Sequence, residues 1–253
     1  MKNTVKKIVT AGLGAVLLSA ICMLIACTDA PDSSEYEAEK IDGGVSLIVK
    51  RDKRVIDIYA VTSDKKPVTV PIKGGIPLRI ESGAPTSIPL IQTGTKLILK
   101  GNIIELTCAN NDLTALNVQG VPALQKLDCS GNELTSLDVH GLTALTDLVC
   151  SKNLLSLLKV HDLKALQSLD CSDNRLASLD IQGLPALENL TCSGNQLSSL
   201  EIQDVKSLQF LDCSDNQLTA LSVRELNTLK SLNCSGNQLT ALDIQSRSAL
   251  NSL

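Results

Sequence analysis

The sequence predicts a β-rich solenoid of 21-residue coils, preceded by a small β cap. Seven cysteines recur at a spacing of 21 residues, an asparagine stands three places after each of them, and 35 of the 44 leucines lie beyond residue 105. The chain of 253 residues has only three aromatic side chains, the type that usually anchors an irregular core or lines a small-molecule pocket. Repetition, rather than a cavity, therefore organises the predicted core.

Residues 1–26 have the pattern of a secretory signal peptide. Lys2, Lys6 and Lys7 precede an apolar run that ends at Ala26, and such a run close to the start of a chain is typical of an export signal. An uncleaved membrane anchor is the alternative, because the run is nearly long enough to span a bilayer. Gly and Ser dilute the run and no basic residue follows it closely, which favours the cleaved signal.

The end of this run carries a candidate lipidation site. The sequence Leu24-Ile25-Ala26-Cys27 resembles the lipobox of bacterial lipoproteins, and this resemblance implies that Cys27 becomes the lipidated first residue of the mature chain. Several acyl chains on one cysteine would hold the protein stably on a membrane. Residues 27–40 would then be the lipidated cysteine and a disordered acidic tether, because they are polar and nearly devoid of core-forming side chains.

Residues 41–102 form the predicted β-rich N-terminal cap. Short runs of β-forming residues, such as 45–49, 55–59 and 97–99, alternate with turn-prone stretches. About sixty residues make a thin core on their own, so we expect this segment to pack on the neighbouring repeats. A solenoid needs such a cap because its first coil would otherwise expose an apolar face. An independent functional module is the alternative.

Residues 103–253 form the predicted solenoid of seven Cys-bearing coils. The frame Leu-x-Cys-Ser-x-Asn-x-Leu-x-x-Leu-x-Val/Ile recurs, and residues 127–139 are a typical copy. Stacked coils place equivalent side chains in ladders, with leucine and cysteine pointing inward and the asparagine amide satisfying backbone groups at each turn. The predicted ladder residues are Cys108, Cys129, Cys150, Cys171, Cys192, Cys213 and Cys234, with Asn111, Asn132, Asn153, Asn174, Asn195, Asn216 and Asn237.

This frame resembles the bacterial leucine-rich repeats with a 21-residue period, and especially the cysteine-ladder repeats of internalin-J-like surface proteins. The resemblance covers about residues 103–253 and implies a leucine-rich-repeat solenoid that binds partners at a cell surface. The attachment differs, since those internalins are joined to a cell wall through a C-terminal sorting signal. Here the predicted anchor is an N-terminal lipid, so fold kinship alone does not transfer the host-invasion role.

The cysteines are predicted to be buried free thiols that behave as small hydrophobic side chains. Neighbours in register point the same way, which suits the geometry of a disulfide poorly. No Cys-x-x-Cys or Cys/His spacing indicates a zinc site.

No catalytic residues, cofactor or metal are predicted, and the chain does not have the features of an enzyme. Hydrolase, kinase and nucleotide-binding motifs are absent from the sequence. Asp128, Asp170 and Asp212 each precede a cysteine, but their pattern indicates solvated residues rather than paired acids. His140 and His161 occupy equivalent positions in adjacent coils, where a solvated pair is expected instead of a metal site, since no third ligand is evident.

Binding is the function that the pattern favours. Residues beside the ladder positions project outward, and a solenoid joins them into one long surface. Most of them are Ser, Thr, Gln and Asp, so the exceptions are candidate contacts for a partner: Phe210, Val149, Leu154 and Leu157. The alternative for Phe210 is that it simply leans over a neighbouring coil.

Together these features predict a membrane-anchored bacterial surface protein that is adhesin-like and non-catalytic. Its repeat face would bind a protein or glycan on a host or neighbouring cell, and the lipid would attach it to a membrane of the cell envelope, at the outer membrane or cell surface. A structural scaffold lipoprotein within the envelope is the alternative. Nucleic acid is not an expected partner, because the formal net charge of −4 has no basic stripe to offset it.

Overall fold

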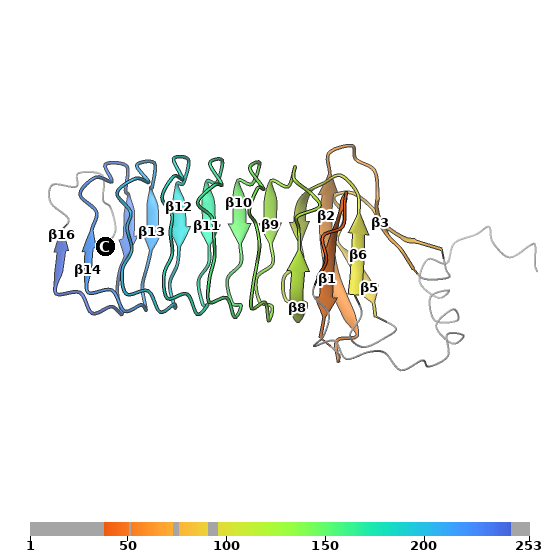
Figure 1. Cartoon of the computed structure of the whole chain (residues 1–253), viewed down its shortest axis with the longest axis horizontal. Coiled ribbons are helices and arrows are strands. Elements are labelled where there is room, and N and C mark those ends of the chain that lie inside the picture. The colour runs from red at the N-terminus through yellow and green to blue at the C-terminus, as the bar shows by residue number, and fades with distance from the viewer. Residues whose placement is uncertain (1–37, 51, 73–75, 91–95, 244–253) are drawn as a thin grey trace, which may run out of the picture. The chain divides into compact units, whose positions relative to one another are not determined.

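The computed structural model describes residues 38–50, 52–72, 76–90 and 96–243. The predicted signal peptide, the lipidation residue Cys27 and most of the predicted tether lie outside these residues. Every regular element in the described part is a β-strand (Figure 1). No helix among the described residues is long and apolar enough to cross a membrane.

The repeats stack into a parallel sheet in which each coil contributes one short strand. Each leucine that lies two places before a cysteine pairs with the equivalent leucine of the next coil, from Leu106 to Leu232. This confirms the predicted solenoid and its 21-residue register (Figure 1). Its strands are β7 (Ile103–Thr107), β9 (Lys126–Asp128), β10 (Asp147–Val149), β11 (Ser168–Asp170), β12 (Asn189–Thr191), β13 (Phe210–Asp212) and β15 (Ser231–Asn233).

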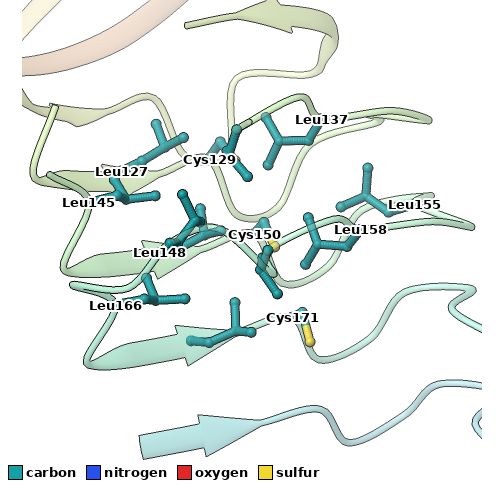
Figure 2. Close-up of a cluster of buried hydrophobic side chains, with 14 of the residues drawn as sticks. Leu127, Cys129, Leu137, Leu145, Leu148, Cys150, Leu155, Leu158, Leu166 and Cys171 are labelled. Carbon is teal, nitrogen blue, oxygen red and sulfur yellow. The ribbon is translucent and has the colours of Figure 1, made fainter. Parts of the chain in front are cut away.

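The core lies inside the stacked coils. Figure 2 shows Leu127 and Leu148 beside Cys129 and Cys150, with Leu158 reaching toward them from the other side of the coil. These five side chains are each at most 2% exposed. Alternation along each strand causes this burial, because successive side chains point to opposite faces of a sheet. The central residue of each three-residue strand therefore faces inward and its two neighbours face outward.

On the other side of the coils, the described strands are fewer and pair less regularly. Its strands are β8 (Leu113–Asn117) in the first coil, and β14 (Ala220–Ser222) and β16 (Ala241–Asp243), which pair in parallel with each other. Lys159 and Asp180 form an isolated parallel bridge between two coils on this side. We name the side that carries these strands the back side.

Each coil turns through a residue with left-handed backbone, two places after its cysteine. Its φ angle lies between 51° and 65° in all seven coils. Glycine, asparagine and aspartate adopt this conformation at the lowest cost, and they fill six of the seven positions. Lys152 is the exception, with a φ of 54°. The seven residues are Asn110, Gly131, Lys152, Asp173, Gly194, Asp215 and Gly236.

The N-terminal strands cover the first coil from both sides. Strand β1 pairs antiparallel with β8 on the back side, and β2 pairs antiparallel with β7 on the ladder side. The two resulting sheets have the orders β4-β3-β6-β1-β8 and β15-β13-β12-β11-β10-β9-β7-β2-β5. The strands of the cap are β1 (Gly44–Val49), β2 (Val55–Thr62), β3 (Val68–Val70), β4 (Leu78–Ile80), β5 (Thr86–Pro89) and β6 (Lys96–Lys100).

Close backbone contact and two ion pairs join the cap to the first coils. Gly120 lies against the turn before β1, where a Cβ atom would stand 1.7 Å from the carbonyl oxygen of Ile41. Lys50 Nζ lies 2.6 Å from Glu133 Oε1, and this hydrogen bond and charge raise the pKa of Lys50. Lys53 Nζ lies 3.1 Å from Asp112 Oδ2. The cap and the repeats therefore share their sheets and their core.

Candidate binding face

The parallel sheet presents two rows of side chains to solvent, which we name the outer face. One row holds the residues three places before each cysteine, and the other holds the residues directly before it. Equivalent residues of neighbouring coils pair in register, so each row runs along the sheet from strand to strand. The first row is Glu105, Lys126, Asp147, Ser168, Asn189, Phe210 and Ser231, and the second is Thr107, Asp128, Val149, Asp170, Thr191, Asp212 and Asn233.

The outer face varies from coil to coil while the framework beneath it stays constant. The inward leucine, the cysteine and the asparagine are identical in all seven coils. The first row of the outer face holds six residue types in seven positions, including an acid, a base and an aromatic. Packing fixes the inward positions, because a core tolerates little change of volume or polarity. The outward side chains lie outside this core, so core packing does not fix their identity, although the second row also supplies acceptors for the turns.

The asparagine ladder holds the coils together from within. In the middle of the stack, Asn174 donates from Nδ2 to the carbonyl oxygens of Cys150 and Cys171, at 3.0 and 3.1 Å. Its Oδ1 accepts from the amide nitrogen of Leu155 at 3.0 Å. Each asparagine thus satisfies backbone groups of its own coil and of the preceding one, as buried polar groups require. The same set of bonds recurs at Asn132, Asn153, Asn195, Asn216 and Asn237.

The first asparagine bonds to the cap instead of to a preceding coil. Asn111 Nδ2 donates to the carbonyl oxygen of Asp57 at 2.7 Å, and its Oδ1 accepts from the Asp57 amide at 2.8 Å. The backbone of β2 therefore takes the place that a coil would occupy.

The seven cysteines line the interior as free thiols. Six of them are fully buried and Cys234 is half-buried. Burial raises the pKa of Cys129, Cys171 and Cys213 to about 12, with a smaller contribution from neighbouring charges. The thiolate is the reactive form of cysteine, so these side chains are inert and serve packing.

The four candidate contact residues do not lie on one surface. Phe210 and Val149 stand half-buried on the outer face, three strands apart in the sheet. Leu154 is half-buried beyond the turn of the third coil, and its amide donates to the Leu134 carbonyl oxygen at 2.9 Å. Leu157 is 55% exposed and belongs to the back side. Phe210 and Val149 are therefore the members that a single partner on the outer face could contact together.

Aspartates on the outer face support the turns that come after them. Asp170 Oδ1 accepts from the amide and the hydroxyl of Ser172, at 3.0 and 2.6 Å. Asp128 and Asp212 make the same two bonds in their coils, and Asn233 makes them in the last. Each bond uses one carboxylate oxygen, so the other retains its capacity to accept from a ligand.

Strand β2 adds an aromatic residue that the sequence pattern did not single out. Tyr59 lies directly opposite Thr107, and Val61 lies opposite Glu105. Both are half-buried, while Ile58 and Ala60 on the same strand are buried. The alternation of apolar and polar residues along β2 predicts that Tyr59 and Val61 face outward, but it does not predict which strand pairs with β2. The antiparallel pairing of β2 with β7 then extends the outer face by one strand.

A shallow hollow of about 180 Å³ lies on the outer face over β7, β9 and β10. We name it the β9 hollow. Its outward lining combines three carboxylates, one ammonium group and two side chains with methyl groups. These residues are Glu105, Asp128, Asp147, Lys126, Thr107 and Val149.

His140 and His161 lie on either side of the Asp162 carboxylate in the turns that follow the back side. Asp162 Oδ2 lies 3.4 Å from His140 Nδ1 and 3.0 Å from His161 Nε2. All three side chains are about half exposed or more. Within the described ranges, no group of three or more histidine, cysteine or acidic side chains could hold a metal ion.

Comparisons with known proteins agree with this geometry. Residues 164–204 and 206–247 match the family model described as leucine-rich repeats in two copies. Among curated proteins none matches the chain. Proteins with leucine-rich repeats commonly bind other proteins and are typically not enzymes.

The solved structures that resemble the chain include two leucine-rich-repeat proteins. The functional domain of InlJ from Listeria monocytogenes, which includes a cysteine ladder, is 34% identical over 64% of this chain, with a TM-score of 0.58. A leucine-rich-repeat protein of Leptospira interrogans is 31% identical over 58% of this chain, with a TM-score of 0.55. The chain spans 37% and 41% of the lengths of these two structures. The repeat region therefore has the leucine-rich-repeat fold, and its cysteine ladder is similar to that of the InlJ domain.

Proposed function

We propose that the outer face binds a protein partner and that the chain is a membrane-anchored, adhesin-like binding module of the bacterial cell envelope without catalytic activity. The lipobox-like sequence at Cys27 supports the anchor, and the acidic segment after it supports a tether between lipid and cap. A host or neighbouring cell would then carry this protein partner at its surface.

The variation of the outer face carries this proposal. Seven coils share one framework, yet the first outward row changes residue type at almost every coil. A scaffold that needed only to be soluble would be served by any polar side chains there. The outward row instead holds an aromatic side chain, a lysine and two acidic side chains in different coils, so a partner can make a different contact at each coil.

The two aromatic side chains mark the extent of the contact surface. Tyr59 on β2 and Phe210 on β13 are separated by six strand spacings in the sheet. At roughly 4.8 Å per spacing this is about 29 Å, which matches the width of a protein interface of ordinary size. Both rings are half-buried and therefore still offer apolar area to a partner.

A site-specific cross-linking experiment tests the outer face. A photoreactive phenylalanine analogue replaces Phe210 in one version of the full chain and Leu157 in another. Each version is added to intact host or neighbouring cells whose surface proteins are labelled, and the mixture is illuminated. The proposal expects adducts from position 210 and none from position 157, because Leu157 lies on the back side. Adducts of equal yield from both positions, or from position 157 alone, would contradict it.

The Phe210→Ala variant separates binding from folding. We expect it to leave the melting temperature unchanged within about 2 °C and to weaken partner capture at least fivefold, as an aromatic anchor would. A large loss of stability would instead show that Phe210 leans over a neighbouring coil as part of the core.

Protease treatment of intact bacteria tests the location. A protein displayed at the surface is cleaved by protease added outside, whereas a scaffold lipoprotein within the envelope is protected until the cells are opened. Protection in intact cells would favour the scaffold function.

A further inference from the structure

Val149 lines the β9 hollow on the side of β10 and has acidic residues around it. Val149 lies beside Asp128, which also lines the hollow, in the strand on one side, and beside Asp170, which lies next to the hollow on β11, in the strand on the other. Asp147 precedes Val149 by two residues on the same strand and faces the same way. Three carboxylates therefore stand around one half-buried, outward-facing isopropyl group.

The charge of this region is unbalanced. The outer-face rows hold five acidic residues and one basic residue between Glu105 and Asn233. The one base, Lys126, stands in the hollow with its ammonium group 3.8 Å from Glu105. The ammonium group of Lys126 therefore already lies among the acidic residues that line the hollow. Because three carboxylates and one ammonium group line it, the hollow still has a net negative charge.

The carboxylates have free capacity to accept hydrogen bonds. Asp128 and Asp170 each use Oδ1 for the serine two residues later, and Asp147 uses Oδ2 for the hydroxyl of Thr146 at 2.7 Å. One oxygen of each carboxylate is left for a ligand. Because that ligand would displace solvent from a shallow hollow, bonds to a charged donor would be the strongest available there.

We propose that the β9 hollow receives a lysine or arginine side chain of the protein partner. The aliphatic stem would lie on Val149, and the cationic head would donate to the surrounding aspartates, since such side chains place their stems on apolar surface while the charge stays among polar groups. This inference rests on the proposed function, and it adds the chemistry of the partner: a basic segment rather than an acidic or neutral one.

The test compares two variants of equal charge change. The first, which we name the hollow variant, neutralises the three aspartates around Val149 by Asp128→Asn, Asp147→Asn and Asp170→Asn. The back-side variant carries Asp138→Asn, Asp180→Asn and Glu201→Gln. Asparagine already occupies the equivalent positions in other coils, as Asn233, Asn189 and Asn117, and Asn233 and Asn117 make the same turn bonds, so both variants should keep the fold.

The probe is a fluorescent peptide of alternating arginine and glycine, and binding to the full chain is followed by anisotropy at low salt. We expect the hollow variant to bind about tenfold more weakly than the parent chain, and the back-side variant to bind within about twofold of it. Equal losses in the two variants would show attraction by net charge alone and would overturn the proposal. Absence of binding to the parent chain would also overturn it.

A second peptide tests the role of Val149. It carries 2-amino-3-guanidinopropionate in place of arginine, which keeps the charge on a shorter stem. We expect this peptide to bind about fivefold more weakly than the arginine peptide to the parent chain, with the difference lost in Val149→Ser. Equal affinity of the two peptides for the parent chain would contradict a stem seated on Val149.

The outcomes distinguish this inference from the proposed function. A partner that is cross-linked at position 210 but is captured equally well by the hollow variant would overturn only the inference that its basic side chain sits in the hollow. A partner that is never cross-linked at the outer face overturns the proposed function as well.

Discussion

Removing one asparagine from the middle of the ladder is expected to destabilise the whole stack. In Asn174→Ala the carbonyl oxygens of Cys150 and Cys171 lose one bond each but keep Asn153 and Asn195 as donors. The amide of Leu155 loses its acceptor and is left inside the coil. An unsatisfied buried donor costs about 1–3 kcal/mol, and the lost bonds to the carbonyls add about 1 kcal/mol. We therefore expect the free energy of unfolding to fall by about 2–4 kcal/mol.

Urea denaturation of the full chain, followed by circular dichroism, measures this change. Asn189→Ala is the matched control, because Asn189 is exposed on the outer face one coil away from Asn174. The control should stay within about 0.5 kcal/mol of the parent chain, as surface substitutions usually do. The same small effect in Asn174→Ala would refute the ladder as a source of stability.

Three further changes test other parts of the molecule. Gly120→Ala should destabilise the chain by about 1–3 kcal/mol in urea, because a Cβ atom there meets the backbone of the cap, whereas Gly101→Ala, with its nearest neighbours at 3.5 Å, should not. Lys152→Gly should raise the free energy of unfolding by about 0.5–1 kcal/mol, because it relieves a left-handed backbone at φ 54°, while Lys164→Gly should lower it. Stability should fall as the pH rises from about 9 toward 12, because burial raises the pKa of the ladder thiols and the unfolded chain releases their protons first. Cys171→Ala should make this fall shallower, and an unchanged slope would argue against a buried thiol at that position.

The repeat architecture was predictable from the sequence because one residue set recurs at one spacing. Leu127, Cys129 and Asn132 each have a counterpart 21 residues later, and only stacking of equal coils gives every copy the same environment. The inward direction of leucine and cysteine followed from alternation along a strand.

Which residues form the outer face was harder to predict from the sequence, because it depends on pairing between distant segments. Tyr59 joins the face through the pairing of β2 with β7, which are separated by four other strands in sequence. Nothing local to Tyr59 indicates that partner strand. Val149 and Leu157 lie eight residues apart in one coil and look alike as apolar exceptions, yet the turn between them places them on different sides.

The reactivity of the cysteines tests most directly whether repeated side chains stack inward and leave the varied ones outside. The chain is treated with a thiol reagent at neutral pH, first folded and then in denaturant, and peptide mass mapping assigns each adduct. The stacked solenoid predicts that Cys234, which is half-buried, reacts first, and that the six fully buried cysteines react only after unfolding. Ready labelling of Cys150 or Cys171 in the folded chain, or disulfides between coils, would contradict it.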